Sequence, residues 1–351
     1  MTFDSVGEII QREISTKTFP GACIEIGRTK ETLWRGAFGH LTYDPKASAV
    51  DHHTIFDLAS LTKVIGTTTL AMCHINTGRW TLSDRVNQHL SSWSGADREL
   101  VTIADLLAHT SGLQAYLPLF QEQVERDAFK EKISRLPLEY TPRTMSVYSD
   151  LGFILLGFLL EDLVKEPLDQ QFRNMTESCG IDDLQYLPPN SWKIRTAPTG
   201  ENPLRGRCLV GEVHDDNGWA LGGVAGHTGL FGSAPAVGRF ARIILSDLRG
   251  SDILASSTTL QVFTRRTSVP YSSRALGWDT MLPTSSCGHS FSKSAIGHTG
   301  FTGTSLWIDP ELDLYIVCLT NRVHHPVDSN AMQKFRPALH DTAVRASGVI
   351  D

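Results

Sequence analysis

Three short motifs hold residue types that can carry out acyl transfer. In the first, Ser60-Leu61-Thr62-Lys63, a serine hydroxyl is followed three positions later by a lysine amine. A lysine can act as the base for a serine when burial and a neighbouring cation or phenol lower its pKa. The pair begins a predicted helix, so both side chains share one face near the free N–H groups of the helix N-terminus. The structural alternative is an N-cap serine with a solvated lysine. This segment alone supports the catalytic and the structural interpretation equally.

The second and third motifs add a phenol and a glycine-rich strand edge. Tyr148-Ser149-Asp150 precedes an apolar helix. There Asp150 is a natural N-cap and Tyr148 can be a core aromatic with a bonded hydroxyl, which is the stronger interpretation of this motif alone. Gly297-His298-Thr299-Gly300 leads into the predicted strand 304–308, and its glycines permit close approach by a ligand backbone. Its structural alternative is a turn closed by a hydroxyl hydrogen bond.

Two of these patterns occur a second time, and one further cluster could bind a metal. Ser290-Phe291-Ser292-Lys293 fits Ser-x-x-Lys, but no helix follows it, so we favour the copy at Ser60. Gly226-His227-Thr228-Gly229 repeats the third pattern in a glycine-rich loop, 222–232. His214-Asp215-Asp216, together with His52-His53, could hold a metal, but the spacing fits no known site. We therefore predict no metal and no cofactor.

The elements that position these motifs follow from hydrophobic periodicity. Residues 5–17 predict an amphipathic helix in which Ser5 and Glu8 have capping-box spacing. Residues 58–77 predict a buried helix that ends before Gly78. Further helices are predicted at 102–109, 151–165, 237–248 and about 329–346, and strands at 21–28, 32–38, 275–281, 304–308 and 312–319.

Strands at both ends of the chain, with helices between them, predict one α/β domain that both termini complete. We expect this domain to comprise residues 1–58 together with 266–351. A mainly helical domain of residues 59–265 would be inserted between them. The active site would then lie at the interface, because Ser60 falls at the boundary.

Composition excludes several classes of protein. The chain has 351 residues, enough for about two domains, and a net charge of −6, which argues against a nucleic-acid partner. Its longest apolar stretch, 153–160, is too short to span a membrane. No export signal is visible, and the six cysteines are scattered without a Cys-x-x-Cys motif, so we predict a cytoplasmic protein. A trimmed, exported mature form would have the same features.

Taken together and in order, the three motifs resemble the serine β-lactamase and penicillin-binding-protein superfamily. The class C branch, which includes DD-peptidases, D-aminopeptidases and family VIII carboxylesterases, is the most similar. The resemblance covers about residues 5 to 345. It rests on the frame Phe56-x-x-Ala59-Ser60-x-Thr62-Lys63, on 106–113 (Leu-Leu-Ala-His-Thr-Ser-Gly-Leu), on Gly78-x-x-x-Leu82-x-Asp84-x-Val86 and on the glycine-rich stretch 222–230.

This resemblance implies a β-lactamase/transpeptidase-like α/β (α+β) fold, with an antiparallel sheet flanked by helices and an inserted all-helical domain. By motif, Ser60 would be the nucleophile, Lys63 its partner and Tyr148 the general base. The backbone N–H groups of Ser60 and Phe301 would form the oxyanion hole. The substrate-binding residues would be Asp150, His298, Thr299 and Gly300.

Two positions depart from the usual family pattern. His298 stands where most β-lactamases have lysine, and a mostly neutral imidazole binds a substrate carboxylate less well than a permanent cation. Asp150 stands where asparagine is usual, so an amide donor is lost and an anion is introduced. Both changes disfavour efficient β-lactam hydrolysis and leave ester hydrolysis and D-amino-acid peptide cleavage open.

The sequence therefore predicts a serine hydrolase that cleaves an ester or amide through an acyl-enzyme on Ser60. We rank carboxylesterase and D-amino-acid peptidase as equal, with β-lactamase behind them. A non-catalytic penicillin-binding-like protein is one alternative, although its expected marks, a broken Ser-x-x-Lys or a lost tyrosine, are not seen. A metal-dependent hydrolase is the other alternative, which chelator-sensitive activity would favour.

Overall fold

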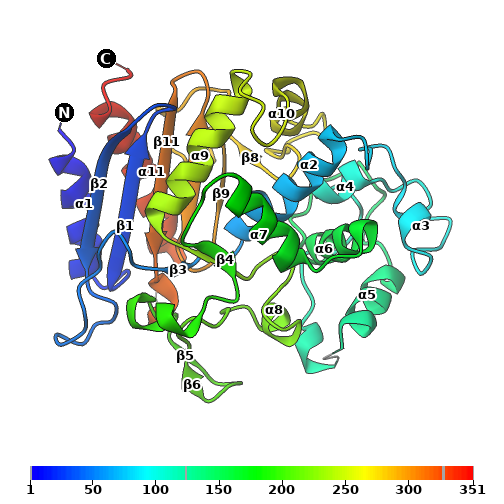
Figure 1. The fold of residues 1–351 in the computed structure, drawn as a ribbon, viewed down its shortest axis with the longest axis horizontal. Coiled ribbons are helices and arrows are strands. Elements are labelled where there is room, and N and C mark those ends of the chain that lie inside the picture. The colour runs from blue at the N-terminus through cyan, green and yellow to red at the C-terminus, as the bar shows by residue number, and fades with distance from the viewer. Residues whose placement is uncertain (1, 123–124, 326–328, 351) are drawn as a thin grey trace.

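Strands from the two ends of the chain form one six-stranded antiparallel sheet (Figure 1). The computed structural model describes residues 2–122, 125–325 and 329–350. The strand order is β2-β1-β11-β10-β9-β8, so the N-terminal β1 pairs directly with the C-terminal β11. This confirms that both termini complete a single sheet. The strands are β1 (Gly21–Gly27), β2 (Thr32–Gly39), β8 (Asp279–Thr280), β9 (Ile296–Thr299), β10 (Ser305–Asp309) and β11 (Leu314–Thr320).

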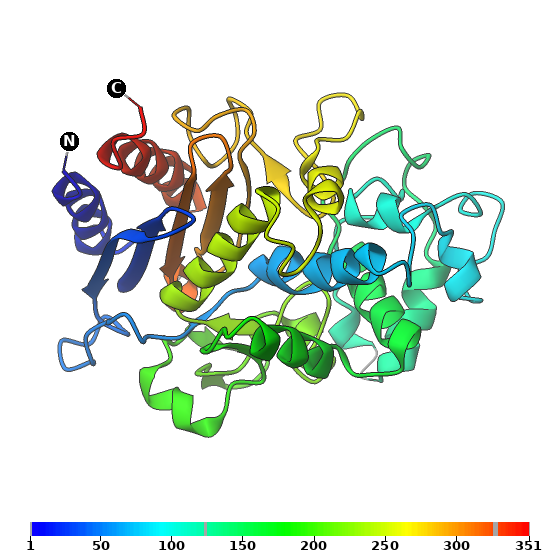
Figure 2. The same cartoon turned by 45° about the horizontal axis from the view of Figure 1, so that its top comes forward.

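Helices cover both faces of this sheet, which is why its central strands are apolar on both sides (Figure 2). Helices α1 (Asp4–Ser15) and α11 (Ser329–Ala346) pack together over one face, where Ile10, Ile24 and Phe335 share a core. Helix α9 (Ala234–Leu248) covers the other face, where Phe240 shares a second core with Val317. Burial of these apolar faces fixes the sheet that carries strand β9.

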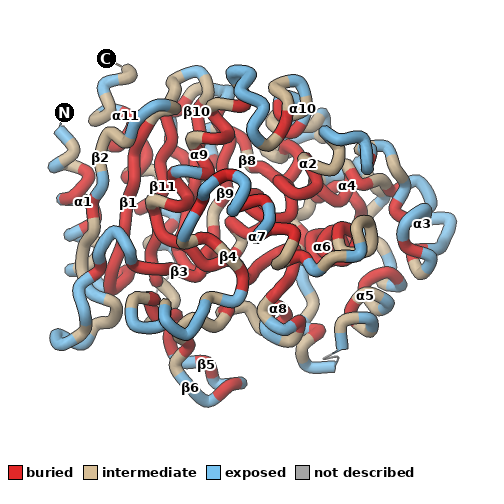
Figure 3. Tube along the Cα trace, viewed as in Figure 1, coloured by how far each residue is buried: buried red, intermediate tan, exposed pale blue. Residues whose placement is uncertain are grey.

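A helical region adjoins the sheet, and its centre is a helix that is buried over most of its length (Figure 3). This helix is α6 (Asp150–Val164), of which residues 151–160 are all buried. Helices α3 (Val86–His89), α4 (Ile103–Leu107), α5 (Arg126–Arg135) and α7 (Leu168–Ser178) contact it. The chain also forms α2 (Thr69–Asn76), α8 (Asp216–Ala220), α10 (Ser257–Thr264) and short helical turns at Leu119–Gln121, Asn190–Arg195 and Arg322–His324.

A small second sheet lies between the large sheet and the helical region. Its order is β3-β7-β4, with β3 (Phe56–Asp57), β7 (Leu230–Gly232) and β4 (Leu184–Tyr186). A two-stranded hairpin, β5 (Glu201–Asn202) and β6 (Arg207–Cys208), projects nearby. Strand β3 leads directly to Ser60, so this sheet holds the chain where the two larger parts meet.

Two sequence predictions of local structure outside the site motifs were wrong. Helix α1 begins at Asp4, and Ser5 donates to the carbonyl of Thr2 at 2.8 Å, so no capping box forms between Ser5 and Glu8. The strand predicted at 275–281 shrinks to β8, because Gly277 turns the chain with φ +79° and donates its N–H to Leu107.

The predicted division into two domains, 1–58 with 266–351 and 59–265, stays a prediction. Helix α9, which the division places in the helical part, packs against strands β1 and β11 of the large sheet. Within the described ranges, no helix combines the length and the apolar character that crossing a membrane requires.

Candidate active site

Ser60 lies in a tight turn between strand β3 and the helix that follows. Ala59 has φ +46°, a left-handed conformation that residues with a Cβ rarely adopt. The helix therefore begins after Ser60, and the sequence prediction that it starts at residue 58 was wrong. Its first part, Lys63–Thr68, is a π-helical turn that leads into α2. Such turns are frequent at functional sites, and here the turn puts Lys63 beneath Ser60.

Lys63 is fully buried, and its ammonium is surrounded by oxygen acceptors. Its Nζ donates to Ser60 Oγ at 3.0 Å and to the carbonyl of His227 at 3.1 Å, and it forms an ion pair with Asp150 Oδ1 at 2.7 Å. Burial acts to lower the pKa of Lys63, but the charge of Asp150 and the Tyr148 phenol outweigh it and raise that pKa. A lowered pKa, the condition under which Lys63 could act as the base, is therefore not met, and Lys63 rests as a cation.

Tyr148 and Asp150 reach the same place from the start of helix α6. Ser149 caps this helix, since its Oγ accepts the N–H of Gly152 at 3.2 Å. Asp150 is therefore not the N-cap, and its carboxylate is free to meet Lys63. Lys63 Nζ lies 4.8 Å from the centre of the Tyr148 ring. Burial raises the pKa of Tyr148, although hydrogen bonds with Lys63 and Ser60 oppose the shift, so the phenol is neutral at rest.

A residue of the stretch 106–113, His109, contacts the ring of Tyr148 and the backbone beside it. The His109 ring lies 4.8 Å from the Tyr148 ring, and its Nδ1 accepts the backbone N–H of Ser149 at 3.0 Å. Burial holds the pKa of His109 well below its usual range, with the charges of Arg274 and Lys63 adding to the effect. A neutral His109 therefore fixes the backbone on which Tyr148 sits.

The third motif forms the sheet side of the site. His298 and Thr299 end strand β9, and a Cβ on Gly300 would meet the carbonyl oxygen of Leu58 at 2.7 Å, so only glycine fits there. His298 Nδ1 donates to the carbonyl of Thr299 at 2.8 Å. Burial, together with the charges of Arg274 and Lys63, holds the pKa of His298 well below its usual range. His298 is thus a neutral imidazole, as the sequence suggested.

The second copies of the motifs have different places. Ser290 lies in the loop between β8 and β9, and Ser292 donates to Asp309 at 2.8 Å, so that copy is structural. His227, from the second glycine-rich copy, lies across the cleft from His298 and supplies the carbonyl that Lys63 contacts. Its Nε2 lies 2.9 Å from Asp215 Oδ1. The repeated motif around His227 did not by itself predict this contact with Lys63.

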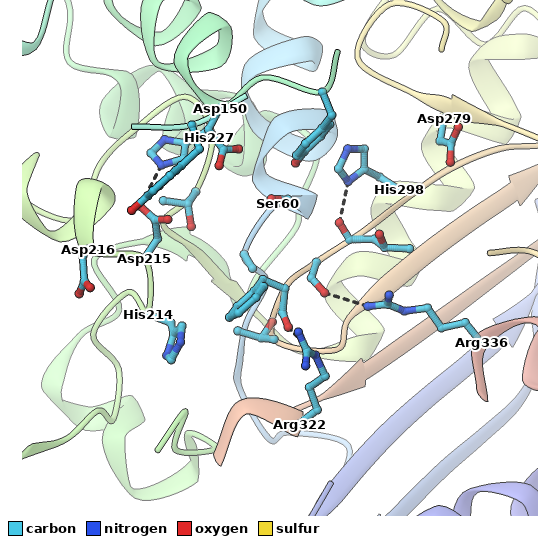
Figure 4. Close-up of a pocket in the computed structure, with 18 of the residues that line it drawn as sticks. Ser60, Asp150, His214, Asp215, Asp216, His227, Asp279, His298, Arg322 and Arg336 are labelled. Carbon is cyan, nitrogen blue, oxygen red and sulfur yellow. Dashed lines mark hydrogen bonds and ion pairs between the residues drawn. The ribbon is translucent and has the colours of Figure 1, made fainter. Parts of the chain in front are cut away.

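These groups meet in one cleft of about 750 Å³ (Figure 4). Ser60 lies near its centre, and the Phe301 side chain, 62% exposed, forms part of its rim. The other predicted site residues that line the cleft are Tyr148, Asp150, His298, Thr299 and Gly300, while Lys63 lies beneath Ser60. The structure therefore brings together all the predicted site residues.

The two sides of the cleft differ in charge. Asp150, Asp215 and Asp216 lie on the side of the helical region (Figure 4). Each is close to a basic side chain, namely Lys63, His227 and Arg205 respectively. Although burial acts in the opposite direction, His227 lowers the pKa of Asp215 to about 2.

The sheet side carries guanidinium groups instead: Arg274, Arg322 and Arg336, none of them within ion-pair distance of a described carboxylate. Sequence reasoning missed these arginines because no short motif contains them. The cleft therefore carries three arginines and Asp279 on the sheet side, and three carboxylates with Lys63, His227 and Arg205 beside them on the other.

The metal alternative gains no support from the geometry of the described part of the chain. His214, Asp215 and Asp216 line the cleft, whereas His52 and His53 are exposed. Among the described residues, no group of three or more histidine, cysteine, aspartate or glutamate side chains is arranged to hold a metal ion. The carboxylates of Asp215 and Asp216 instead contact His227 and Arg205.

Comparison with known proteins finds a matching family, relatives in sequence and solved structures with the same fold. The sequence model of the family described as "Beta-lactamase" matches residues 7–338. The chain is 28% identical to the N-acetylmuramyl-L-alanine amidase of Bacillus subtilis (strain 168), over 92% of this chain and 81% of that protein. It is 29% identical to an Escherichia coli (strain K12) protein provisionally named a D-alanyl-D-alanine carboxypeptidase, over 78% and 70% of the two chains. The solved structure of EstCE1, a hydrolase with promiscuous acyltransferase activity, shares the fold, with a TM-score of 0.77, 19% identity and 97% coverage of both chains.

Proposed function

Because this chain belongs to the beta-lactamase family of serine hydrolases, we propose that it cleaves its substrate through an acyl-enzyme on Ser60. One observation carries the proposal: the buried ammonium of Lys63 lies 3.0 Å from Ser60 Oγ and 4.8 Å from the Tyr148 ring centre, beneath the cleft that Ser60 and Tyr148 line. A serine held between a cation and a phenol is the arrangement that activates a hydroxyl for attack on a carbonyl.

Acylation follows from the protonation states of the three side chains. Ser60 Oγ forms a bond to the carbonyl carbon while its proton passes to the Tyr148 oxygen. Tyr148 passes its own proton to the leaving nitrogen or oxygen as the bond to the leaving group breaks, so the phenol stays neutral overall. The ammonium of Lys63 stabilises the negative charge that develops on the two oxygens during transfer. Water then cleaves the acyl-enzyme along the same route in reverse.

The backbone N–H groups of Ser60 and Phe301 are the proposed oxyanion hole. Among the described residues, neither N–H donates to another protein atom, so both are free to bind a substrate oxygen. Two such donors, fixed before the reaction, stabilise a tetrahedral intermediate more than the planar substrate.

The substrate that the site supports best is an amide within a short peptide of the kind found in bacterial cell walls, with a D-amino-acid peptide as the model case. The names of the Bacillus subtilis and Escherichia coli relatives point to amide bonds. Ester hydrolysis is the second candidate. The observation that favours it is the neutral His298, which requires no carboxylate on the leaving group.

A substrate panel tests whether β-lactams rank behind the other candidate substrates. We expect p-nitrophenyl acetate, which has no carboxylate, to be cleaved with kcat/KM at least about tenfold above nitrocefin. The reason is that the site has His298 in place of the lysine that would make a charge-assisted bond with the β-lactam carboxylate, and such a bond typically contributes about 1.4 kcal/mol or more of binding free energy, or about tenfold. Steady-state rates at pH 7 measure it, and preferential hydrolysis of nitrocefin would contradict the substrate assignment.

Asp150 is expected to set the alkaline limit of activity. Its carboxylate raises the pKa of Lys63, so the ammonium persists to higher pH and is lost as pH rises through that pKa. Asp150→Asn removes the negative charge and lowers the pKa of Lys63. The alkaline limb of kcat/KM against pH should therefore move to lower pH in the variant. An alkaline limb that stays in place would mean that Lys63 does not act as the cation.

A cytoplasmic location also stays a proposal. It is supported by the six cysteines, which are all free thiols in the structure, as in proteins of reducing compartments.

A further inference from the structure

Asp57 lies directly behind the proposed oxyanion hole, and its carboxylate is shielded from solvent. It ends strand β3 and is 1% exposed. Its Oδ1 accepts the backbone N–H of Ala59 at 2.8 Å, and its Oδ2 accepts the backbone N–H of His214 at 2.7 Å. Its backbone carbonyl accepts the hydroxyl of Thr302 at 2.7 Å. One residue thus makes three contacts with three segments far apart in the sequence.

Two of these contacts adjoin the two proposed oxyanion donors. Ala59 directly precedes Ser60, and its left-handed φ of +46° needs outside support because its Cβ disfavours that conformation. Thr302 directly follows Phe301. The third contact also adjoins Phe301, because the His214 ring stacks on the Phe301 ring with 5.8 Å between their centroids.

The carboxylate is ionised at neutral pH, so both of its oxygens can accept. Burial raises the pKa of Asp57 to about 6, although the N–H groups of His214 and Ala59 oppose the shift. The charged groups that face it are Asp215, which adds to the rise, and Arg205, which opposes it. Above pH 6 the anion can therefore hold Ala59 and His214 together, each through a charge-assisted hydrogen bond.

We propose that Asp57 is the positioning residue of the oxyanion hole, which orients the N–H groups of Ser60 and Phe301 toward one point. The inference rests on the proposed function, because it presumes that Ser60 is the nucleophile. The carboxylate does not touch the substrate. The carboxylate holds the turn that sets the orientation of the Ser60 N–H. The main chain of Asp57 and the residue His214 hold the segment that sets the orientation of the Phe301 N–H.

A buried carboxylate with a purely structural role would have similar contacts, and the chain contains one. Asp309 is also fully buried, and it accepts the backbone N–H groups of Ser292, Glu311 and Leu312. It ends strand β10 at the opposite end of that strand from Ser305, which pairs with Thr299. Asp309→Asn is therefore the matched control for Asp57→Asn.

The test compares Asp57→Asn and Asp309→Asn in the full chain. The asparagine side chain keeps one oxygen as an acceptor. Its NH₂ group replaces the other oxygen and therefore faces a backbone N–H, which is also a donor. We expect Asp57→Asn to lower kcat/KM for p-nitrophenyl acetate about 100-fold, as when one oxyanion donor is lost, and to weaken binding of phenylboronic acid in parallel. The boronate forms a tetrahedral adduct on Ser60, so its affinity reports the oxyanion hole in a way that thermal stability does not. Asp309→Asn should stay within about threefold of wild type in both measurements.

Rescue gives a second readout. Glycine adopts a positive φ without cost, so Ala59→Gly added to Asp57→Asn should recover at least about tenfold of the lost activity. If Asp57→Asn does not fold, Thr302→Val tests the proposal in its place, because it removes only the hydroxyl that donates a hydrogen bond to the Asp57 carbonyl. Its kcat/KM and boronate affinity should then fall together by about tenfold.

The inference is overturned if Asp57→Asn, or Thr302→Val in its place, loses no more activity and boronate affinity than Asp309→Asn. Labelling by a fluorophosphonate separates this outcome from failure of the proposed function. If the wild-type chain is labelled on Ser60 and the Asp57 or Thr302 variant keeps as much activity as Asp309→Asn, Ser60 remains the nucleophile and only the role of Asp57 is excluded. A wild-type chain that is not labelled on Ser60 removes the proposed function itself.

Discussion

Ser60→Ala is expected to lower kcat/KM by about 10⁴-fold or more, the scale seen when a serine hydrolase loses its nucleophile. The Ser60 hydroxyl is the atom that would bond to the substrate, and neither Lys63 nor Tyr148 can replace it from its position beneath or beside the serine. The folded state should be unaffected, because the change removes one partly exposed oxygen. Steady-state hydrolysis of p-nitrophenyl acetate and a thermal melt measure the two effects.

The chain supplies its own control for this experiment. Ser290 begins the second Ser-x-x-Lys, but it lies in a loop far along the chain, and its backbone N–H is held by Asp341. Ser290→Ala should therefore keep wild-type activity. Retention of more than about 1% of wild-type activity in Ser60→Ala, with contaminating esterase excluded, would contradict the assignment of the nucleophile.

Lys63→Met is expected to cost about 10³-fold in kcat/KM and, in addition, about 3 kcal/mol of folding free energy. The activity falls because the cation that stabilises the transferring charge is gone. The stability falls because Asp150, whose side chain is only 20% exposed, keeps a carboxylate with no ammonium beside it. Methionine retains much of the shape of the lysine, so loss of packing contributes little.

Addition of Asp150→Asn to Lys63→Met separates the two effects. The double variant leaves no uncompensated charge, so most of the lost stability should return, whereas activity should not. Urea unfolding at constant m-value and kcat/KM for the same ester, measured on both single variants and the double, complete the cycle. A double variant as unstable as Lys63→Met would show that the ion pair does not govern stability, and an active Lys63→Met would remove Lys63 from the mechanism.

The sequence was informative where a property depends on neighbours in the chain. Strands at both ends, the buried helix α6 and the ordered motifs at Ser60, Tyr148 and His298 could be predicted, because hydrophobic period and motif order are local patterns. The same patterns indicated the fold, and the family match over residues 7–338 agrees with it.

Features that depend on contacts across the fold could not be predicted. The pKa of Lys63 is raised, because α6 brings Asp150 to 2.7 Å from it. The turn at Ala59 delays the start of the helix because the carboxylate of Asp57 holds it. Arg274, which lies over the Tyr148 ring at 5.0 Å, belongs to no motif, and only the fold brings the two together.

Covalent labelling of the native protein by a fluorophosphonate, read out as intact mass and then by peptide mapping, shows whether Ser60 is the nucleophile. We expect one phosphonyl group per chain, located on Ser60, and no adduct on Ser60→Ala or on wild-type protein that has been unfolded before exposure. An adduct located on another residue, or no adduct on folded wild-type protein that hydrolyses p-nitrophenyl acetate, would contradict it.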